Sequence, residues 1–342
     1  FNTGYTTLKV TIPASVKEIG ESAFASSASL ASVTFADNAG ASLTIGARAF
    51  SSTGITSITL PAQFTGFAAN IFYAGESGTL LASISVPDKN AEYASHGGIL
   101  YTKDYATLLF CPPEFTGENG TATVHNDTKT IAAEAFRYCS HLTAIDFGTA
   151  QVTSVGAEAF RSTGLTSIAL PDSVQTIGES AFVNSNSLTT FRVPESLLSF
   201  DASTLGLDAL TTLTVSDSND RYEVDQNAAL ILTDGAEKTL VYYLRSGAPE
   251  TYAVPAGTTQ IGENAFRGAA VSEVSIPASV TFVAANAFNG SALATVTFAQ
   301  EDGAQLIIGQ YAFYNTQLTE VALPARTFAI DDYAFAAAKI SY

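Results

Sequence analysis

The sequence lacks several features on which common protein classes depend. It contains no Met and no Trp, and it has two Cys among its 342 residues. Two thiols are too few for a disulfide-rich scaffold or for a zinc site with four Cys ligands. A run of about 18 apolar residues, which a transmembrane helix requires, is also missing from this sequence.

Positive charge is scarce as well. Lys and Arg total 15 against 32 Asp and Glu, which gives a net charge of -17. A surface this acidic repels phosphate groups, so nucleic acids and anionic membranes are excluded as expected partners. The missing Met and the start at Phe1 predict a processed or truncated piece of a longer product, without a signal or anchor in this segment.

The most informative feature present is a repeat marked by the dipeptide Ala-Phe. It recurs every 22 to 26 residues except across two longer gaps. Ile71-Phe72 is a degenerate member, and a second degenerate turn is expected near Leu205. The exact copies end at Phe24, Phe50, Phe136, Phe160, Phe182, Phe266, Phe288, Phe313 and Phe335. Such a period is typical of a solenoid, in which each repeat buries its apolar face against its neighbours.

Each repeat approximates the pattern L-x-x-V-x-L-P-x-S-V-x-x-I-G-x-x-A-F, most clearly over residues 165–182. Apolar positions two apart with Thr and Ser between them predict a strand, which Pro then ends. The Gly either adopts a conformation that a side chain forbids or lets two backbones approach closely. Ala-Phe is expected in a short helical or 3₁₀ turn, with Phe filling the core between stacked turns.

This motif resembles the BspA-like class of bacterial leucine-rich repeats, and the resemblance extends from about Thr7 to Phe335. It implies a leucine-rich-repeat solenoid that is mainly β, with a ladder of parallel strands. Members of the class are found on the bacterial surface or secreted and are associated with adhesion, which implies an extracellular location. The class carries no catalytic motif, so the resemblance transfers no active-site residue.

We predict a single solenoid of about eleven turns over residues 1–342, with insertions at approximately 88–123 and 217–252. The two insertions align with each other, since residues 99–101 match 230–232 and residues 108–110 match 240–242. Turn-like residues separate the two apolar runs of each insertion, so each is interpreted as a β-hairpin that stands off the solenoid.

Tyrosine is concentrated in these insertions, which hold seven of the 14 in the chain. Two interpretations are open, because a Tyr side chain serves equally well as a ligand contact or as packing. The hairpins either bind a ligand through their Tyr residues or pack them onto the edge of the solenoid. As ligand contacts we select Tyr101, Tyr105, Tyr242 and Tyr243. Tyr101 alternates with Leu100, and Tyr242 alternates with Val241 and Tyr243, so strand alternation predicts that at least one residue of each of these two sets faces outward.

Other candidate groups favour structural roles. Cys139 occupies a position that holds Ser or Thr in most repeats, so it is expected to be structural, with a disulfide to Cys111 as the alternative. Residues 217–225 fail as a calcium loop because Arg221 and Tyr222 stand where Asp or Asn and Gly are needed. A solvated loop is expected there, and weak calcium binding is the alternative. We predict no catalytic, cofactor-binding or metal-binding residue and no cofactor.

The leading functional hypothesis is a secreted or cell-surface protein that binds a host or matrix protein or glycan without catalysis. One alternative is a polysaccharide-active enzyme on a β-solenoid, and another is a passive spacer. An enzyme of that kind needs a cluster of acids on one face. The exposed strand positions are instead mostly Thr and Ser, which disfavours the enzyme.

Overall fold

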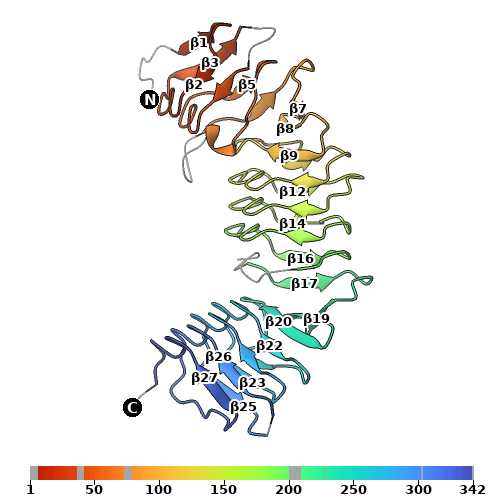
Figure 1. Cartoon of the computed structure of the whole chain (residues 1–342), viewed down its shortest axis with the longest axis vertical. Coiled ribbons are helices and arrows are strands. Elements are labelled where there is room, and N and C mark those ends of the chain that lie inside the picture. The colour runs from red at the N-terminus through yellow and green to blue at the C-terminus, as the bar shows by residue number, and fades with distance from the viewer. Residues whose placement is uncertain are drawn as a thin grey trace. The chain divides into compact units, whose positions relative to one another are not determined.

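The computed structural model describes residues 7–36, 42–72, 79–199, 209–226, 228–301 and 303–340. They form two compact units, the first comprising Phe1–Thr166 with Ile177–Ser185 and the second Ser167–Thr176 with Asn186–Tyr342. Each unit is a β-solenoid of stacked parallel strands (Figure 1). The expected degenerate turn near Leu205 lies outside the described residues. A single continuous solenoid of about eleven turns remains a prediction.

The first unit is built from short strands and one 3₁₀ helix. Its elements are β1 (Leu8–Ile12), β2 (Glu18–Ile19), β3 (Leu30–Phe35), β4 (Thr44–Ile45), β5 (Ser57–Thr59), η1 (Ala69–Ile71), β6 (Ser83–Ser85), β7 (Tyr93–His96), β8 (Ile99–Thr102), β9 (Thr107–Phe110), β10 (Thr121–Thr123), β11 (Thr130–Ile131), β12 (Ala144–Asp146) and β13 (Ser154–Val155).

The second unit has the same construction, and β15 (Thr176–Ile177) contributes one residue to each unit. Its elements are β14 (Ser167–Ile168), β16 (Thr190–Val193), β17 (Thr212–Val215), β18 (Tyr222–Asp225), β19 (Ala229–Asp234), β20 (Glu237–Tyr243), β21 (Thr251–Ala253), β22 (Gln260–Ile261), β23 (Glu273–Ile276), β24 (Phe282–Val283), β25 (Thr295–Phe298), β26 (Leu306–Ile308) and β27 (Thr327–Ile330).

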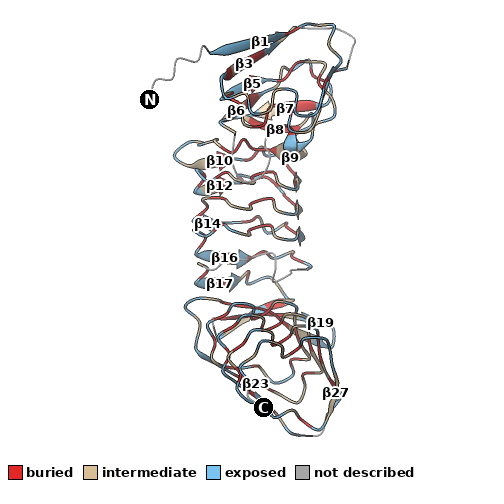
Figure 2. Ribbon diagram, turned by 90° about the vertical axis from the view of Figure 1, so that its left-hand side faces the viewer, coloured by how far each residue is buried: buried red, intermediate tan, exposed pale blue. Residues whose placement is uncertain are grey.

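Repeats contribute strands to two parallel ladders. In the second unit these ladders run β21-β23-β25 and β20-β22-β24-β26-β27. The register places Val274 opposite Val296 and Ile261 opposite Val283, so equivalent repeat positions lie side by side. Figure 2 shows buried and exposed residues alternating along the strands, as a sheet with one buried face requires.

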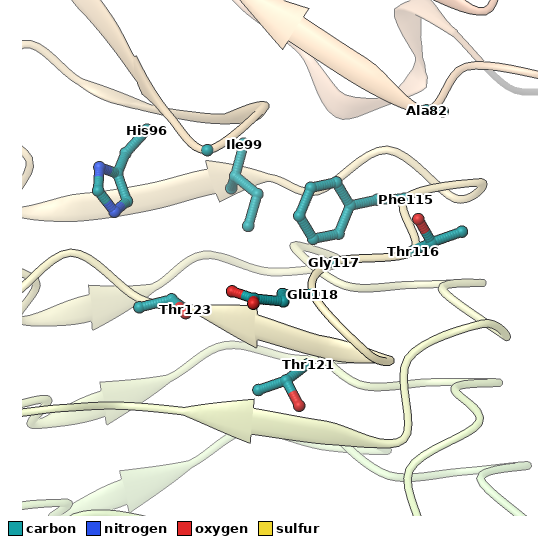
Figure 3. A pocket seen from close by; sticks show the side chains of 10 residues that line it. Ala82, His96, Ile99, Phe115, Thr116, Gly117, Glu118, Thr121 and Thr123 are labelled. Carbon is teal, nitrogen blue, oxygen red and sulfur yellow. The ribbon is translucent and has the colours of Figure 1, made fainter.

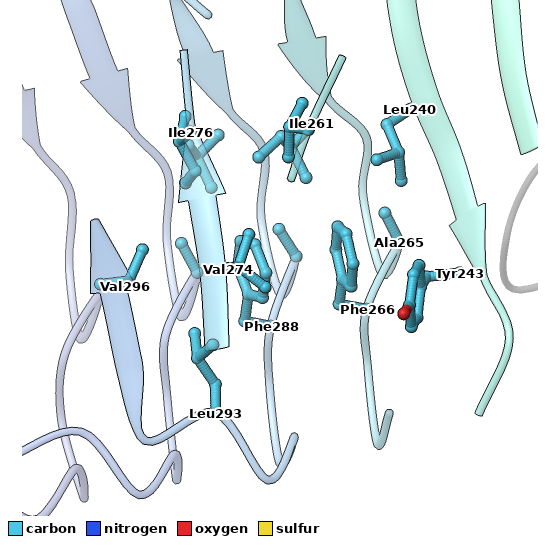
Figure 4. Packing of buried hydrophobic residues seen from close by; sticks show 14 of the residues in the cluster. Leu240, Tyr243, Ile261, Ala265, Phe266, Val274, Ile276, Phe288, Leu293 and Val296 are labelled. Atoms are coloured by element: carbon cyan, nitrogen blue, oxygen red, sulfur yellow. The ribbon is translucent and has the colours of Figure 1, made fainter. Parts of the chain in front are cut away.

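The Phe residues of the Ala-Phe pairs form continuous stacks in the core, as the sequence predicts. Successive ring centroids from Phe266 to Phe288 and from Phe288 to Phe313 are 4.6 and 4.9 Å apart. Figure 4 shows this row with Tyr243 beside it. In the first unit Phe160 stacks on Phe136 at 5.2 Å. These distances are close to the spacing of neighbouring strands, so each ring contacts the next.

The helical turns expected at Ala-Phe are β-turns in the structure. In each exact Ala-Phe pair, the residue two before the Phe and the residue two after it have a positive φ. Around Phe160 these residues are Glu158 (55°) and Ser162 (56°). Left-handed residues at this spacing prevent a helical run, which needs consecutive right-handed residues. The Phe160 amide instead donates to the Ala181 carbonyl of the next repeat at 2.8 Å. Within the described ranges, η1 is the sole helix.

The sequence left two explanations for the Gly of the Ile-Gly pairs, an unusual backbone conformation or a close approach of two backbones. The structure supports the close approach. Gly46, Gly156 and Gly178 all lack a positive φ. A Cβ atom added to Gly178 would lie 2.4 Å from the Ala157 backbone nitrogen. A side chain at this position therefore collides with the preceding repeat, whereas a Cβ at Gly20 would meet no described atom within 4 Å.

Replacing Gly178 with Ala is expected to lower the free energy of unfolding by about 1–3 kcal/mol, because the new methyl group forces two backbones apart. Gly20→Ala is the matched control, and it is expected to be neutral or to stabilise by up to about 1 kcal/mol. Urea denaturation of both variants measures the difference. Equal effects from the two substitutions would contradict the packing described here.

Truncating a stacked ring is expected to be costly. Phe182→Ala removes a fully buried side chain that stacks 5.2 Å from Phe160, and should destabilise the protein by about 3–5 kcal/mol. Phe328→Ala makes the same truncation at a residue with 65% exposure and should change stability by about 0.5 kcal/mol or less. A loss below about 1 kcal/mol for Phe182→Ala would mean that the stack is not what holds the repeats together.

Candidate ligand-binding site

The two insertions are built into the strand ladders. In the first, β7, β8 and β9 pair in antiparallel fashion, and β9 then lies parallel to β11 with Leu108 opposite Ile131. In the second, β18, β19 and β20 repeat this arrangement, and β20 lies parallel to β22. The hairpins therefore exist as predicted, but the expectation that they stand off the solenoid is wrong, because each returning strand joins a ladder.

An asparagine shared by both insertions fastens each hairpin to the repeat before it. The Asn90 side chain donates to the carbonyls of Pro61 and Phe64, at 3.0 and 3.1 Å. Its Oδ1 accepts from the amide of Tyr93 at 2.8 Å. Asn219 makes the equivalent contacts with Pro194 and Tyr222. Both asparagines precede an aligned Tyr by three residues, so alignment of the insertions could have revealed them.

Three of the four tyrosines selected as ligand contacts lie in the core. Tyr101 and Tyr243 are 0% exposed and Tyr242 is 1% exposed, so the expectation that one of each set faces outward is wrong. The reason is that these strands are covered on both faces. Residues 99–101 are all buried, and so are residues 240–243. A strand buried on both faces has no outward side for a Tyr to occupy.

Two buried tyrosines of the second insertion donate hydrogen bonds within the fold. Tyr243 donates to the Pro249 carbonyl at 2.8 Å, and Tyr252 donates to Asp225 at 2.7 Å. Burial raises the pKa of Tyr243 and Tyr222 to about 12, and it also raises the pKa of Tyr101. The packing interpretation therefore holds for these side chains, while a ligand-contact role remains a prediction for the partly exposed Tyr105.

The exposed, Thr-rich positions of the strands form hydrogen bonds within the protein. Thr143, Thr166 and Thr211 each direct Oγ1 to a carbonyl of the preceding repeat at 3.3 Å. These hydroxyls stabilise the stacking of strands, which agrees with the expectation that Thr serves as strand surface. They are correspondingly less free to bind a ligand.

Cys139 fills the predicted small, half-polar position. It is buried with its thiol 3.5 Å from the Pro112 carbonyl, and Thr53 and Thr316 at the same repeat position also bond to backbone carbonyls. Cys111 and Cys139 are both free thiols. Burial, with Cys139 alongside, raises the pKa of the Cys111 thiol well above its usual range, so the thiolate needed for nucleophilic chemistry is disfavoured.

No cluster of three or more metal-ligating side chains occurs among the described residues. In the 217–225 segment, Asp225 accepts the Tyr252 hydroxyl and Asn219 binds backbone groups. Two oxygen donors of that segment are therefore occupied by the fold.

The first insertion borders a pocket that the sequence did not reveal. The pocket has a volume of about 490 Å³ and is framed by the β7–β8 turn, the 115–118 segment and strand β10 (Figure 3). Its lining residues are Ala82, His96, Gly97, Ile99, Phe115, Thr116, Gly117, Glu118, Thr121 and Thr123. A concave site with apolar walls and a few polar groups is the usual form of a small ligand site.

A tight turn positions Glu118 at this pocket. The backbones of Glu118 and Thr121 bond to each other in both directions, at 3.0 and 3.1 Å. Between them Asn119 and Gly120 have φ values of 52° and 80°, the geometry of a type I′ turn, for which Asn-Gly is preferred. Gly117 also has a positive φ of 59°. It has no room for a side chain either, since a Cβ there would lie 2.0 Å from the Thr121 carbonyl oxygen. The turn is therefore closely constrained.

Two histidines that appear scattered in the sequence meet beside this pocket. The rings of His96 and His125 are 5.1 Å apart, and Tyr105 stacks on His125 at 3.9 Å. Burial, with a further contribution from His125, lowers the pKa of His96, so its ring is neutral at pH 7. The third histidine, His141, instead pairs with Glu114 at 2.9 Å. The Asn119-Gly120 turn signal was the sequence feature that could have drawn attention to this region.

Comparison with known proteins identifies the repeat. The profile of the BspA type leucine rich repeat region matches residues 1–96, 116–228 and 246–342, with six copies. The chain belongs to this family. The two breaks in the match fall within the insertions, so the BspA-type repeats are interrupted where the hairpins occur.

Solved structures show the same fold. The BspA-type chain is 27% identical to the pneumococcal vaccine antigen PcpA, with a TM-score of 0.50, covering 61% of this chain and 51% of that one. It thus spans about half of that antigen. A leucine rich cell surface protein from Faecalibacterium prausnitzii A2-165 has 19% identity and a TM-score of 0.55, with 98% and 81% covered. No curated protein matches the chain at a significant level.

A search of the described residues for a helix with the length and hydrophobicity of a membrane span finds none.

Alkaline titration should separate the buried tyrosines from the exposed ones. In the unfolded chain Tyr ionises near pH 10. Because the folded pKa of Tyr101, Tyr222, Tyr243 and Tyr252 is raised, ionisation favours unfolding, and stability is expected to fall as pH rises above about 10. Tyrosinate absorbance of the native protein should show a late-ionising fraction that urea abolishes. One common transition near pH 10, with the melting temperature unchanged, would contradict this burial.

Proposed function

We propose that this BspA-type protein is a secreted or surface-exposed recognition protein that binds a host or matrix protein or glycan without catalysis. The pocket beside the first insertion is the observation that carries the proposal. It combines a volume of about 490 Å³ with polar and apolar walls held by well-bonded backbone. Binding at a preformed site avoids the entropic cost of ordering loops, which favours recognition there.

The backbone around the pocket is tied down on several sides. The Phe115 amide donates to the Pro112 carbonyl at 2.9 Å, and the Glu114 amide donates to the Leu81 carbonyl at 3.0 Å. On the opposite side, His96 and Ile99 pair across the β7–β8 turn. We therefore assign recognition to this pocket beside the first insertion.

Similar proteins support an extracellular location. The Faecalibacterium protein is described as a cell surface protein, and the pneumococcal protein as a vaccine antigen. Both descriptions belong to those proteins, and we infer a comparable exposed location for this chain. Its acidic balance, with a net charge of -17, agrees with a protein that is soluble outside the cell and selects against anionic polymers.

Cleavage of a polysaccharide is the less favoured alternative. Most glycosidases use two carboxyl groups about 5–9.5 Å apart on either side of the bond that breaks. Glu118 is the one carboxylate among the described residues that line the pocket. Binding of a ligand can use this single carboxylate, whereas glycoside hydrolysis of this kind needs a second carboxylate.

The proposal is tested with an array of matrix proteins and glycans, probed with the wild-type protein and with Phe115→Ala. Loss of the pocket's aromatic wall is expected to weaken capture about tenfold, as for a central interface residue. Phe328→Ala is the control, since it truncates an exposed Phe in the other unit. Melting temperatures establish that both variants are folded. Absence of any partner on the array, or equal capture by both variants, would refute recognition at this pocket.

A further inference from the structure

We infer that the pocket at the first insertion receives a positively charged side chain, Arg or Lys, from a partner protein. This inference rests on the proposed recognition function and names the chemistry of its ligand. Three observations carry it: the charge that lines the pocket, the shape of its walls and the field of the whole chain.

The charge at the pocket is negative and unbalanced. Glu118 contributes the carboxylate, and in the described part of the chain it makes no ion pair. Its neighbour Glu114 differs in this respect, since it is paired with His141. The other titratable lining residue is His96, whose lowered pKa leaves the ring neutral at pH 7. A carboxylate without a paired cation is complementary to a guanidinium or ammonium group.

The walls suit a long side chain that is apolar along its stem and charged at its tip. Figure 3 shows the Glu118 carboxylate between the Phe115 ring and the strand that carries Thr121 and Thr123, below Ile99. Ile99 offers aliphatic contact to the methylene groups of Arg or Lys. The Phe115 ring adds a cation–π contact, and the Thr hydroxyls can accept further hydrogen bonds.

The turn that carries Glu118 is anchored to the next repeat. Gly120 has a positive φ of 80°, and a Cβ there would lie 2.6 Å from the Thr143 hydroxyl. Thr143 and Ala144 in turn donate their amides to the Gly120 carbonyl. The backbone of Glu118 is therefore fixed beside the pocket, and its side chain is exposed to a bound cation.

The net charge of the chain favours the same class of partner. At -17, the chain attracts basic proteins over distances of about a Debye length and repels sulfated or sialylated glycans. A neutral sugar would gain nothing from this field. A basic protein segment is therefore favoured over a glycan, and the glycan becomes an outcome of the test.

The probes are the peptides acetyl-Gly-Arg-Gly-amide and acetyl-Gly-citrulline-Gly-amide, which have nearly the same shape and differ in charge. Backbone amide NMR of the whole chain follows their binding. The Arg peptide is expected to shift resonances of residues 96–99 and 115–123 and to bind with Kd on the order of 1 mM, as one short contact allows. The citrulline peptide should bind about tenfold more weakly, because it lacks the charge.

Glu118→Gln is the deciding variant, and Glu273→Gln at an exposed position of strand β23 is its control. Both remove one negative charge, and only the first alters the pocket. We expect Glu118→Gln to weaken the Arg peptide about tenfold and Glu273→Gln to leave it within about twofold. Equal binding of the two peptides, or no effect of Glu118→Gln, would overturn the inference.

Neutral N-acetylglucosamine tests whether the pocket binds a glycan instead. If it shifts the same resonances and the Arg peptide does not, the pocket is a glycan site and the inference is wrong. The array experiment stays separate, because a partner captured through this pocket without dependence on Glu118 would leave the proposed function in place. A wild-type array without any partner would instead count against the function itself.

Discussion

Successive repeats lie so close that their backbones are in direct contact, and this spacing dictates what each repeat position accepts. Gly178 sits where a Cβ would fall 2.4 Å from the preceding repeat, and Gly156 is in the same situation one turn earlier. The Phe amides bond across to the Ala carbonyls of the next repeat rather than within a helix. The residues two before and two after each Phe have left-handed backbone conformations, which allow the turn to form hydrogen bonds with the next repeat. The stacked rings then fill the space that the short turns enclose.

The insertions respect this same constraint. Their returning strands join the ladder at the repeat spacing, with Leu108 and Leu240 in register with Ile131 and Ile261. Asn90 and Asn219 replace missing backbone contacts with the preceding repeat. Buried tyrosines complete the core where an Ala-Phe pair is absent, as Tyr243 does by stacking 4.7 Å from Phe266. A hairpin can therefore interrupt a solenoid without breaking it, provided that it supplies a strand and a ring.

Recognition is assigned to the place where the ladder is least regular. Along the regular strand faces, Thr hydroxyls form hydrogen bonds with carbonyls of neighbouring repeats. Beside the first insertion, a hairpin turn and the Asn119-Gly120 turn leave a pocket that is lined by one carboxylate. Rigid repeats with a local irregularity give a recognition site its precision, because the scaffold holds the irregular residues in place.

The sequence by itself determined the repeat, the parallel β-solenoid, the Phe core and the two hairpins, because all of these follow from local periodicity. It also placed Cys139 correctly, from the residues at equivalent positions. Tertiary structure alone decided that the Ala-Phe turns are not helical, since the Phe amides bond to another repeat. It decided as well that Tyr101, Tyr242 and Tyr243 face inward, because their strands are covered on both faces. The pocket is also a feature that only the tertiary structure reveals. Its lining residues Ala82, His96, Phe115 and Thr123 come together only once the hairpin is docked on its neighbours.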